Sequence, residues 1–156
     1  MRPYQRVVEW LAANRLALTV ISRTQTPIDN VLMGLSGGRL DTMPGYPVLR
    51  LTTTGRTSGK PRTVPLLFVE RSKGGWVVND TSYGRDERPG WCANLHATPS
   101  AQIEIDGERH DVVARTATPH ECAAYWKKLD DLWPPFARYR SRMRREPHIW
   151  ILEPAE

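Results

Sequence analysis

Apolar residues recur at roughly helical spacing along residues 4–22, with polar and charged side chains between them. That spacing predicts an amphipathic helix. Thr26-Pro27 has the form of an N-cap followed by proline at the first helical position, and predicts a short helix through Leu35. We therefore expect residues 1–36 to form an N-terminal helical segment and residues 37–156 to form the main body of a single domain.

Beyond this segment the pattern changes to that of short strands, in which β-branched and aliphatic residues are separated by glycine-rich or Asp-Gly turns. The predicted strands are 48–54, 62–71, 76–80, 101–105, 109–115 and 148–152. Consecutive tight turns favour antiparallel pairing. A long antiparallel sheet in a small domain tends to curl toward a barrel.

Three helices are predicted among the later strands. A short one covers residues 91–95, after a proline that suits its first turn. Thr118–Glu121 reads as a capping box that opens a helix to about Leu132. Pro134-Pro135 breaks that helix, and a basic helical segment to Arg145 follows. The expected fold class is α+β, with about six mostly antiparallel strands and with N-terminal and inserted helices. A doubly wound parallel fold is disfavoured, because full crossover helices do not separate the strands.

Composition narrows the functional classes. The chain has 156 residues and a net charge of +5, which favours an anionic partner without choosing among them. The two cysteines and four histidines lack the spacing of a disulfide framework or a metal site, so we expect no metal. No apolar run approaches the roughly 20 residues of a membrane span. No secretory leader pattern is present either, and we expect a cytoplasmic protein.

The most unusual stretch is the turn between the first two predicted strands, LTTTGRTSGKPR at residues 51–62. Gly55 and Gly59 let the backbone turn so that N–H groups converge into an anion-binding nest. The side chains that add donors suited to phosphate or carboxylate are Arg56, Thr57, Ser58, Lys60 and Arg62. Neither a Walker A nor a dinucleotide-binding glycine pattern is present. A solvated basic turn would have the same composition.

A second candidate segment, residues 79–95, runs from a strand end through a polar loop to a helix start. That arrangement is a natural edge for a ligand. Trp91 could stack on a planar ring there, and Asn94 could orient it. Alternatively, Trp91 and Leu95, four residues apart, are the buried face of a short helix.

A third segment combines aromatic and basic residues. Trp133, Phe136 and Tyr139 recur every three residues, and five arginines share the stretch 133–145. On a helix the aromatics would form one stripe. The stripe fits a lid over a site, an RNA-contacting or membrane-surface helix, or ordinary core packing with a solvated charged face.

Taken in order, these segments resemble the deazaflavin-dependent nitroreductase family, the F420-dependent oxidoreductases of split β-barrel fold. The specific parts are LTTTGRTSGKPRTVPL at 51–66, PGWCANL at 89–95, the Asp106-Gly107 hairpin and the aromatic, arginine and proline tail. The resemblance runs from about Gly38 to the last strand. It implies a split β-barrel cofactor-binding domain at 37–156. It also implies hydride transfer from reduced F420 to a quinone, a nitroaromatic or an activated alkene.

The resemblance also implies roles for individual residues. The phosphate and oligoglutamate tail of F420 would be held by the basic loop, with Arg56, Thr57, Ser58, Gly59, Lys60 and Arg62. The ring would be lined by Thr63, Val64 and Pro65 through their backbone, with Trp91 and Asn94 near it and Ser82 beside both ring and acceptor. The acceptor pocket would be walled by Trp133, Phe136 and Tyr139. Tyr139 or Ser82 would stabilise the developing negative charge or relay a proton.

Two positions depart from the family pattern. Relatives commonly have Ser-Lys-Gly-Gly where this chain has Ser82–Arg85, SYGR, one residue shorter before the proline. The missing lysine charge would then come from Arg85 or Arg88. The preceding strand ends in Asn79-Asp80, where relatives have small residues, which implies that Asp80 places an extra carboxylate near the ring.

Two other interpretations remain open at this stage. The same fold could bind FMN, or a lipophilic or tetrapyrrole ligand. A basic non-enzymatic module on RNA or an acidic membrane would also explain the charge, although no RRM, KH or helix-turn-helix pattern supports a specific nucleic-acid partner.

The expected partner is a small-molecule electron acceptor, bound by a monomer or a homodimer. The helix at 4–22 could anchor the protein peripherally at the inner face of the cell membrane, where a quinone would be found. It could equally cover one end of the barrel.

Overall fold

The computed structural model describes residues 6, 7, 10, 14 and 45–156. Residues 6, 7 and 10 are helical, as predicted for 4–22. Asn14, within the predicted helix, is described and is not helical, so the helix does not extend through it as predicted. The other residues of that span, and the second helix predicted up to Leu35, lie outside the described residues. Within the part of the chain that is described, no helix has both the length and the apolar character needed to cross a membrane.

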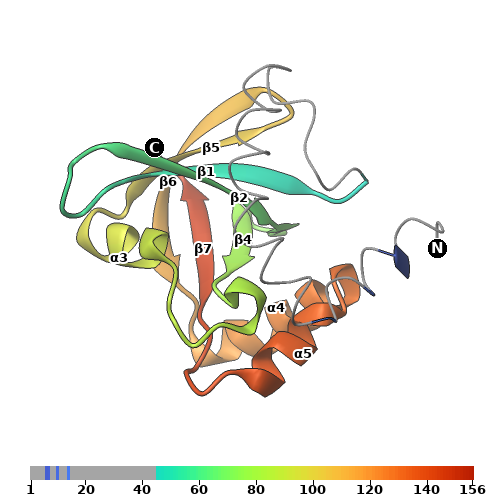
Figure 1. Ribbon diagram of the computed structural model, residues 1–156. Coiled ribbons are helices and arrows are strands. Elements are labelled where there is room, and N and C mark those ends of the chain that lie inside the picture. Colours follow the sequence, from blue (N-terminus) through green and yellow to red (C-terminus); the bar gives the residue numbers. More distant parts are fainter. Residues whose placement is uncertain (1–5, 8–9, 11–13, 15–44) are drawn as a thin grey trace.

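Seven strands form one sheet in the described part of the chain, in the order β2-β1-β5-β6-β7-β4-β3, and every pairing is antiparallel. Their bounds are β1 Val48–Thr54, β2 Pro61–Leu67, β3 Val69–Glu70, β4 Trp76–Asn79, β5 Ser100–Ile105, β6 Glu108–Thr116 and β7 Ile149–Pro154. The sheet is strongly curved (Figure 1). The predicted α+β class with an antiparallel, curling sheet is confirmed, with seven strands where about six were expected.

The extra strand arises at Phe68. The single strand predicted over 62–71 is two, because β2 and β3 are separated only by this residue and lie at opposite ends of the strand order. Phe68 is buried, and its N–H donates to the carbonyl of Pro47 at 3.2 Å. Since one nearly continuous segment forms both edges of the sheet, the sheet has to curl until those edges approach each other. This is the closure of a split barrel.

Three α-helices and a short 3-10 turn complete the described fold. They are α3 (Gly90–Ala97), α4 (Pro119–Leu132), α5 (Pro135–Arg142) and the turn η1 (Ser82–Gly84). The predicted capping box is present, with the Glu121 N–H donating to Thr118 Oγ1 and the Thr118 N–H donating to Glu121 Oε2. The basic helix is shorter than predicted and ends at Arg142 rather than Arg145.

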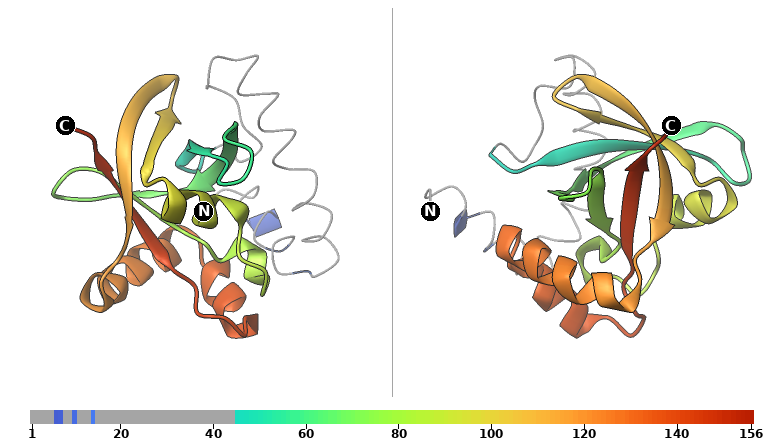
Figure 2. Two further views of the ribbon diagram at one scale, coloured as in Figure 1. Left: turned by 90° about the vertical axis from the view of Figure 1, so that its left-hand side faces the viewer. Right: turned by 180° about the vertical axis from the view of Figure 1, so that it is seen from behind.

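Two apolar clusters fix the positions of these helices. One fills the barrel and includes Trp150 of β7, whose ring lies against the edge of Trp91 from α3. The other lies between the sheet and helices α4 and α5 and includes Leu129, which is fully buried. Both helices lie together at one end of the curved sheet (Figure 2). Helix α3 flanks the β1–β2 hairpin, and helix α5 packs beside the loop that follows β4.

Candidate functional site

A cavity of about 230 Å³ lies where β2, the segment after β4 and the region around α5 meet. Strand β2 contributes Val64–Leu67, and the segment after β4 contributes Asn79–Tyr83 and Arg85. Val48, Pro89 and Trp91 also line it, and Trp133, Phe136 and Tyr139 form an aromatic wall next to the segment after β4. A concave, mostly apolar pocket with polar groups confined to one segment is typical of a site for a flat organic molecule.

The structure brings many of the predicted site residues to this cavity. Those that line it are Val64, Pro65, Asp80, Ser82, Arg85, Trp91, Trp133, Phe136 and Tyr139. The basic loop lies outside it, at the tip of the same β1–β2 hairpin that supplies Val64 and Pro65. Four segments that are distant in the sequence therefore meet around one space.

The polar side of the cavity is a left-handed turn. Ser82, Tyr83 and Gly84 have φ values of 44°, 59° and 83° in succession, a conformation that non-glycine residues rarely adopt. The Asn79 side chain holds the entry to the turn, because its Oδ1 accepts from both the N–H and the hydroxyl of Thr81. This geometry places Ser82 and Tyr83 on the cavity wall.

The aromatic wall comes from two elements rather than one. Trp133 is the C-cap residue that follows α4, whereas Phe136 and Tyr139 belong to α5, so the predicted single helical stripe was wrong, although all three residues share one wall. All three are buried, Tyr139 to 2% exposure. Trp133 Nε1 donates to the Tyr139 hydroxyl at 3.4 Å, and burial raises the pKa of Tyr139 to about 12. The phenol therefore stays protonated at neutral pH. Because an indole only donates, the phenol keeps its own hydrogen available for another acceptor.

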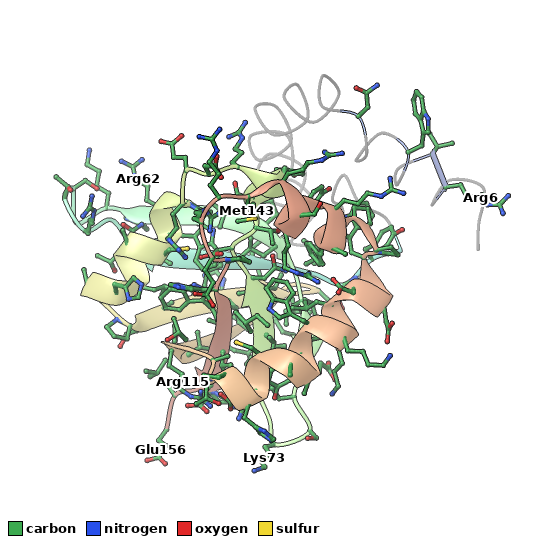
Figure 3. All side chains as sticks on the ribbon, turned by 90° about the horizontal axis from the view of Figure 1, so that it is seen from below. Arg6, Arg62, Lys73, Arg115, Met143 and Glu156 are labelled. Carbon is green, nitrogen blue, oxygen red and sulfur yellow. The ribbon has the colours of Figure 1, made fainter. Side chains whose placement is uncertain are left out.

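The basic loop has a defined backbone and exposed side chains. The Gly55 N–H donates to the Lys60 carbonyl at 2.8 Å, and the Gly59 N–H donates back to the Gly55 carbonyl at 2.7 Å. A Cβ at Gly55 would lie 2.5 Å from Ser58 Oγ and 3.1 Å from the Lys60 carbonyl oxygen, so this close turn leaves little room for a side chain there. Residues 56–62 are exposed, and Figure 3 shows Arg62 at the outer edge of the molecule. The loop thus presents three cations to solvent, with no acidic residue between Gly55 and Arg62.

Asn94 and Trp91 of α3 lie where the hairpin meets the cavity. Asn94 Nδ2 donates to Thr53 Oγ1, and its Oδ1 accepts from the Arg56 N–H, both at 3.0 Å. Both bonds go to the β1–β2 hairpin, and Asn94 does not line the cavity, so its role here is to anchor the basic loop to α3. Trp91 is buried against Trp150, as predicted for the buried face of a short helix, and it also lines the cavity.

Asp80 lines the cavity and forms an ionic cluster with two arginines. The Asp80 carboxylate is fully buried and paired with both Arg88 and Arg145. The Arg88 guanidinium therefore faces Asp80 and the Glu146 carbonyl rather than the cavity, whereas Arg85 lines the cavity. Arg145 was missed by sequence reasoning, because it lies 65 positions from Asp80 and no local pattern marks it.

The same cluster sets the protonation of two neighbouring groups. Burial, together with the charge of Asp80, raises the pKa of the Cys92 thiol, whose Sγ lies 3.6 Å from Asp80 Oδ2. Burial and the charge of Arg88 lower the pKa of His148. At neutral pH the thiol is therefore protonated and the imidazole is neutral. Asp80 remains the centre of an ionic cluster at the base of the cavity.

A curled antiparallel sheet, an apolar cavity at its edge and a cationic loop on the same hairpin define the class. They are features of a split β-barrel protein suited to a flat, anionic cofactor. The family model described as F420H(2)-dependent quinone reductase matches residues 21–154. This chain therefore belongs to the F420H(2)-dependent quinone reductase family. It is an oxidoreductase that transfers a hydride from reduced coenzyme F420 to an organic acceptor.

Individual relatives agree with this assignment. An F420H(2)-dependent quinone reductase of Mycobacterium tuberculosis is 29% identical over 128 residues, which cover 80% of this chain and 85% of the relative. A solved structure of an F420-H2 dependent reductase is 31% identical with a TM-score of 0.63, covering 69% of this chain and 94% of its own. A second solved structure, described as a domain-swapped dimer, has the same identity and TM-score and covers 69% of this chain and 80% of its own.

Proposed function

We propose that the cavity takes the deazaflavin ring of F420 on its β2 side and a quinone on its aromatic side. The basic loop binds the phosphate and oligoglutamate tail. The observation that carries this proposal is the continuity of the β1–β2 hairpin, which has exposed cations at its tip and lines an apolar cavity farther along. One ligand with a flat ring and an anionic tail would satisfy both parts.

The donor set of this chain fits that group. Arg56, Lys60 and Arg62 are exposed and suited to charge-assisted hydrogen bonds with phosphate or carboxylate oxygens. Strand β2 lies at one end of the strand order, and its Val64 and Pro65 line the cavity. A ring placed there would lie beside backbone groups of an edge strand, which can hydrogen-bond a polar heterocycle.

The side chains around the cavity have different roles in the reaction. Bound F420H2 supplies the hydride. The apolar walls exclude water, and Trp133 holds the Tyr139 hydroxyl at the aromatic side. The protonated phenol donates to the acceptor oxygen on which negative charge develops, and Ser82, in the turn packed against α5, offers a second hydroxyl. Arg85 adds a positive charge to the same lining.

Ligand titration tests the cofactor assignment. We expect oxidised F420 to quench tryptophan fluorescence saturably, because Trp91 and Trp133 line the cavity. FMN should bind far more weakly, since it lacks the oligoglutamate tail. Purified protein is titrated with each ligand in parallel, and reduction of menadione by F420H2 is followed at the same protein concentration. Equal affinity for both ligands, or tight binding of FMN alone, would contradict the proposal.

Replacing Tyr139 by phenylalanine tests the proton-donating role. We expect turnover with a quinone to fall by roughly 10- to 100-fold, the usual contribution of one well-placed donor or general acid. The F420 dissociation constant should change little, because the ring system that walls the cavity is kept. Steady-state rates with menadione and F420 titrations measure both quantities. Unchanged turnover would remove Tyr139 from the mechanism.

We also propose that the enzyme is cytoplasmic and binds the inner face of the membrane peripherally. In the described part of the N-terminal segment, Val7 and Trp10 are 55% and 66% exposed, and a tryptophan suits the lipid headgroup region. Co-sedimentation with phosphatidylglycerol vesicles would test this, and protein that stays in the supernatant at low salt would contradict it.

A homodimer is the assembly that we propose. The support is the solved relative described as a domain-swapped dimer, which is 31% identical to this chain. Sedimentation velocity over a range of protein concentrations would measure the mass in solution. A monomer at the highest concentration would contradict the proposal.

A further inference from the structure

The Asp80 carboxylate is the most heavily engaged side chain at the cavity. It has no exposed surface, and each of its two oxygens receives hydrogen bonds from a different direction. Oδ1 accepts from Arg145 Nη1 at 3.1 Å and from the His148 N–H at 2.8 Å. Oδ2 accepts from Arg88 Nη1 and from the Cys92 thiol. The donors come from the loop after β4, from α3 and from the connection between α5 and β7.

Arg145 extends this connection to the left-handed turn. Its guanidinium reaches three acceptors, because Nη2 donates to the Asp80 carbonyl and Nε donates to the Arg85 carbonyl at 3.1 Å. Arg88, in segment 80–88, donates in turn to segment 144–148, from its Nη2 to the Glu146 carbonyl at 3.0 Å. Segments 80–88 and 144–148 are therefore joined by several bonds, most of which pass through or beside Asp80; the Arg144 N–H also donates to Asp86 Oδ1 at 2.6 Å.

These two segments continue directly into two neighbouring parts of the cavity wall, the turn η1 and helix α5, which pack against each other. Segment 80–88 contains Ser82, and segment 144–148 follows α5, which carries Tyr139. We infer that Asp80 is a positioning residue: with Arg145 and Arg88 it fixes the position of the turn that carries Ser82 relative to the helix that carries Tyr139. The inference rests on the proposed function for what the two sides bind. The coupling itself rests on the contacts alone.

Charge explains why a carboxylate is needed at this position. Two guanidinium groups bind the same buried carboxylate, and the Arg145 side chain is only 13% exposed. A single carboxylate between them removes most of their repulsion. The small residue that the family resemblance implies here would leave the two cations unpaired. Asparagine would keep the shape of Asp80 and remove only its charge.

Glu104 supplies a matched control. Its carboxylate also lies between two arginines, Arg50 at 3.3 Å and Arg109 at 3.1 Å, and its side chain is only 14% exposed. It belongs to β5 and does not line the cavity. Glu104→Gln therefore removes a comparable ionic bridge at a position in the sheet that does not line the cavity.

The experiment compares Asp80→Asn, Arg145→Met, Arg145→Lys and Glu104→Gln. Amide hydrogen exchange of the ligand-free proteins reports the coupling without any cofactor. We expect Asp80→Asn and Arg145→Met to speed exchange in segments 81–88 and 143–148 together by roughly tenfold or more, through local opening. Glu104→Gln should leave both segments at the wild-type rate. Faster exchange in only one segment, or in neither, would overturn the inference.

Kinetics separate positioning from a general loss of structure. We expect kcat with menadione to fall at least tenfold in Asp80→Asn while KM changes much less, because misplaced walls cost rate more than binding. Arg145→Lys keeps the charge but not the forked contacts, so it should retain F420 affinity and still lower kcat. If Asp80→Asn does not fold, the two Arg145 variants decide, and wild-type kcat in Arg145→Lys would overturn the inference. If the wild type binds no F420, the proposed function fails while hydrogen exchange still tests the coupling.

Discussion

Replacing Arg56 and Lys60 together by alanine is expected to weaken F420 binding by roughly 10- to 100-fold. Each exposed charge-assisted hydrogen bond to a phosphate or carboxylate contributes about 1 kcal/mol, and 1.4 kcal/mol corresponds to a factor of ten in affinity. The fold should be unaffected, since both side chains are exposed and the Gly55–Lys60 and Gly59–Gly55 bonds are made by backbone groups. Fluorescence titration with oxidised F420 measures the change.

Salt dependence and a charge-matched control make this test specific. The wild-type affinity should fall as salt rises from 20 mM to 500 mM, and the variant should lose most of that dependence because its cations are gone. Lys73→Ala with Lys128→Ala removes the same net charge elsewhere, and Figure 3 shows Lys73 at the opposite end of the molecule from Arg62. Equal losses in the two double variants would assign the effect to overall charge rather than to the loop.

The local parts of the fold could be predicted because their signals are local. The hairpin at Asp106-Gly107, the capping box of α4 and the strand at 48–54 each depend on a few neighbouring residues, and the structure has all three. The division at Phe68 could not be predicted. Residues on both sides of it are equally suited to strands, and only the antiparallel pairing of Val69 with Val77 shows that the segment changes partners.

The site residues also separate into those that could be predicted from the sequence and those that could not. Ser82 and Tyr139, which the family resemblance assigned to the cavity, do line it. These positions could be predicted because their segments lie next to recognisable motifs. The resemblance predicts that Arg88 and Asn94 act on the cofactor, and in the structure their side chains bind Asp80 and the β1–β2 hairpin. An unpaired arginine and an ion-paired one look identical in a sequence. The partner that distinguishes them, here Asp80, depends on tertiary packing.

Gly84→Ala is expected to lower turnover by roughly 10- to 100-fold, the largest effect that we expect from adding a single methyl group. Gly84 has a φ of +83°, and an added Cβ would lie 3.1 Å from both the Cα and the carbonyl oxygen of Tyr139. Those atoms are α5 backbone, so a rotamer change cannot relieve the contact. The turn and the helix must separate by a few tenths of an ångström, which displaces the Tyr139 hydroxyl from a bound acceptor. Small displacements of a reacting group carry rate penalties of this size.

Gly74→Ala separates this displacement from backbone strain. Gly74 has a φ of +86°, yet an added Cβ there would have no atom within 4 Å. Both variants should lose about 1 to 2 kcal/mol of unfolding free energy, the cost of placing alanine in the left-handed region. Only Gly84→Ala should also lose turnover, measured in single-turnover reactions with prebound F420H2 and menadione. If both variants keep wild-type turnover, the contact between η1 and α5 does not set the catalytic geometry. If both lose it equally, backbone strain alone is responsible.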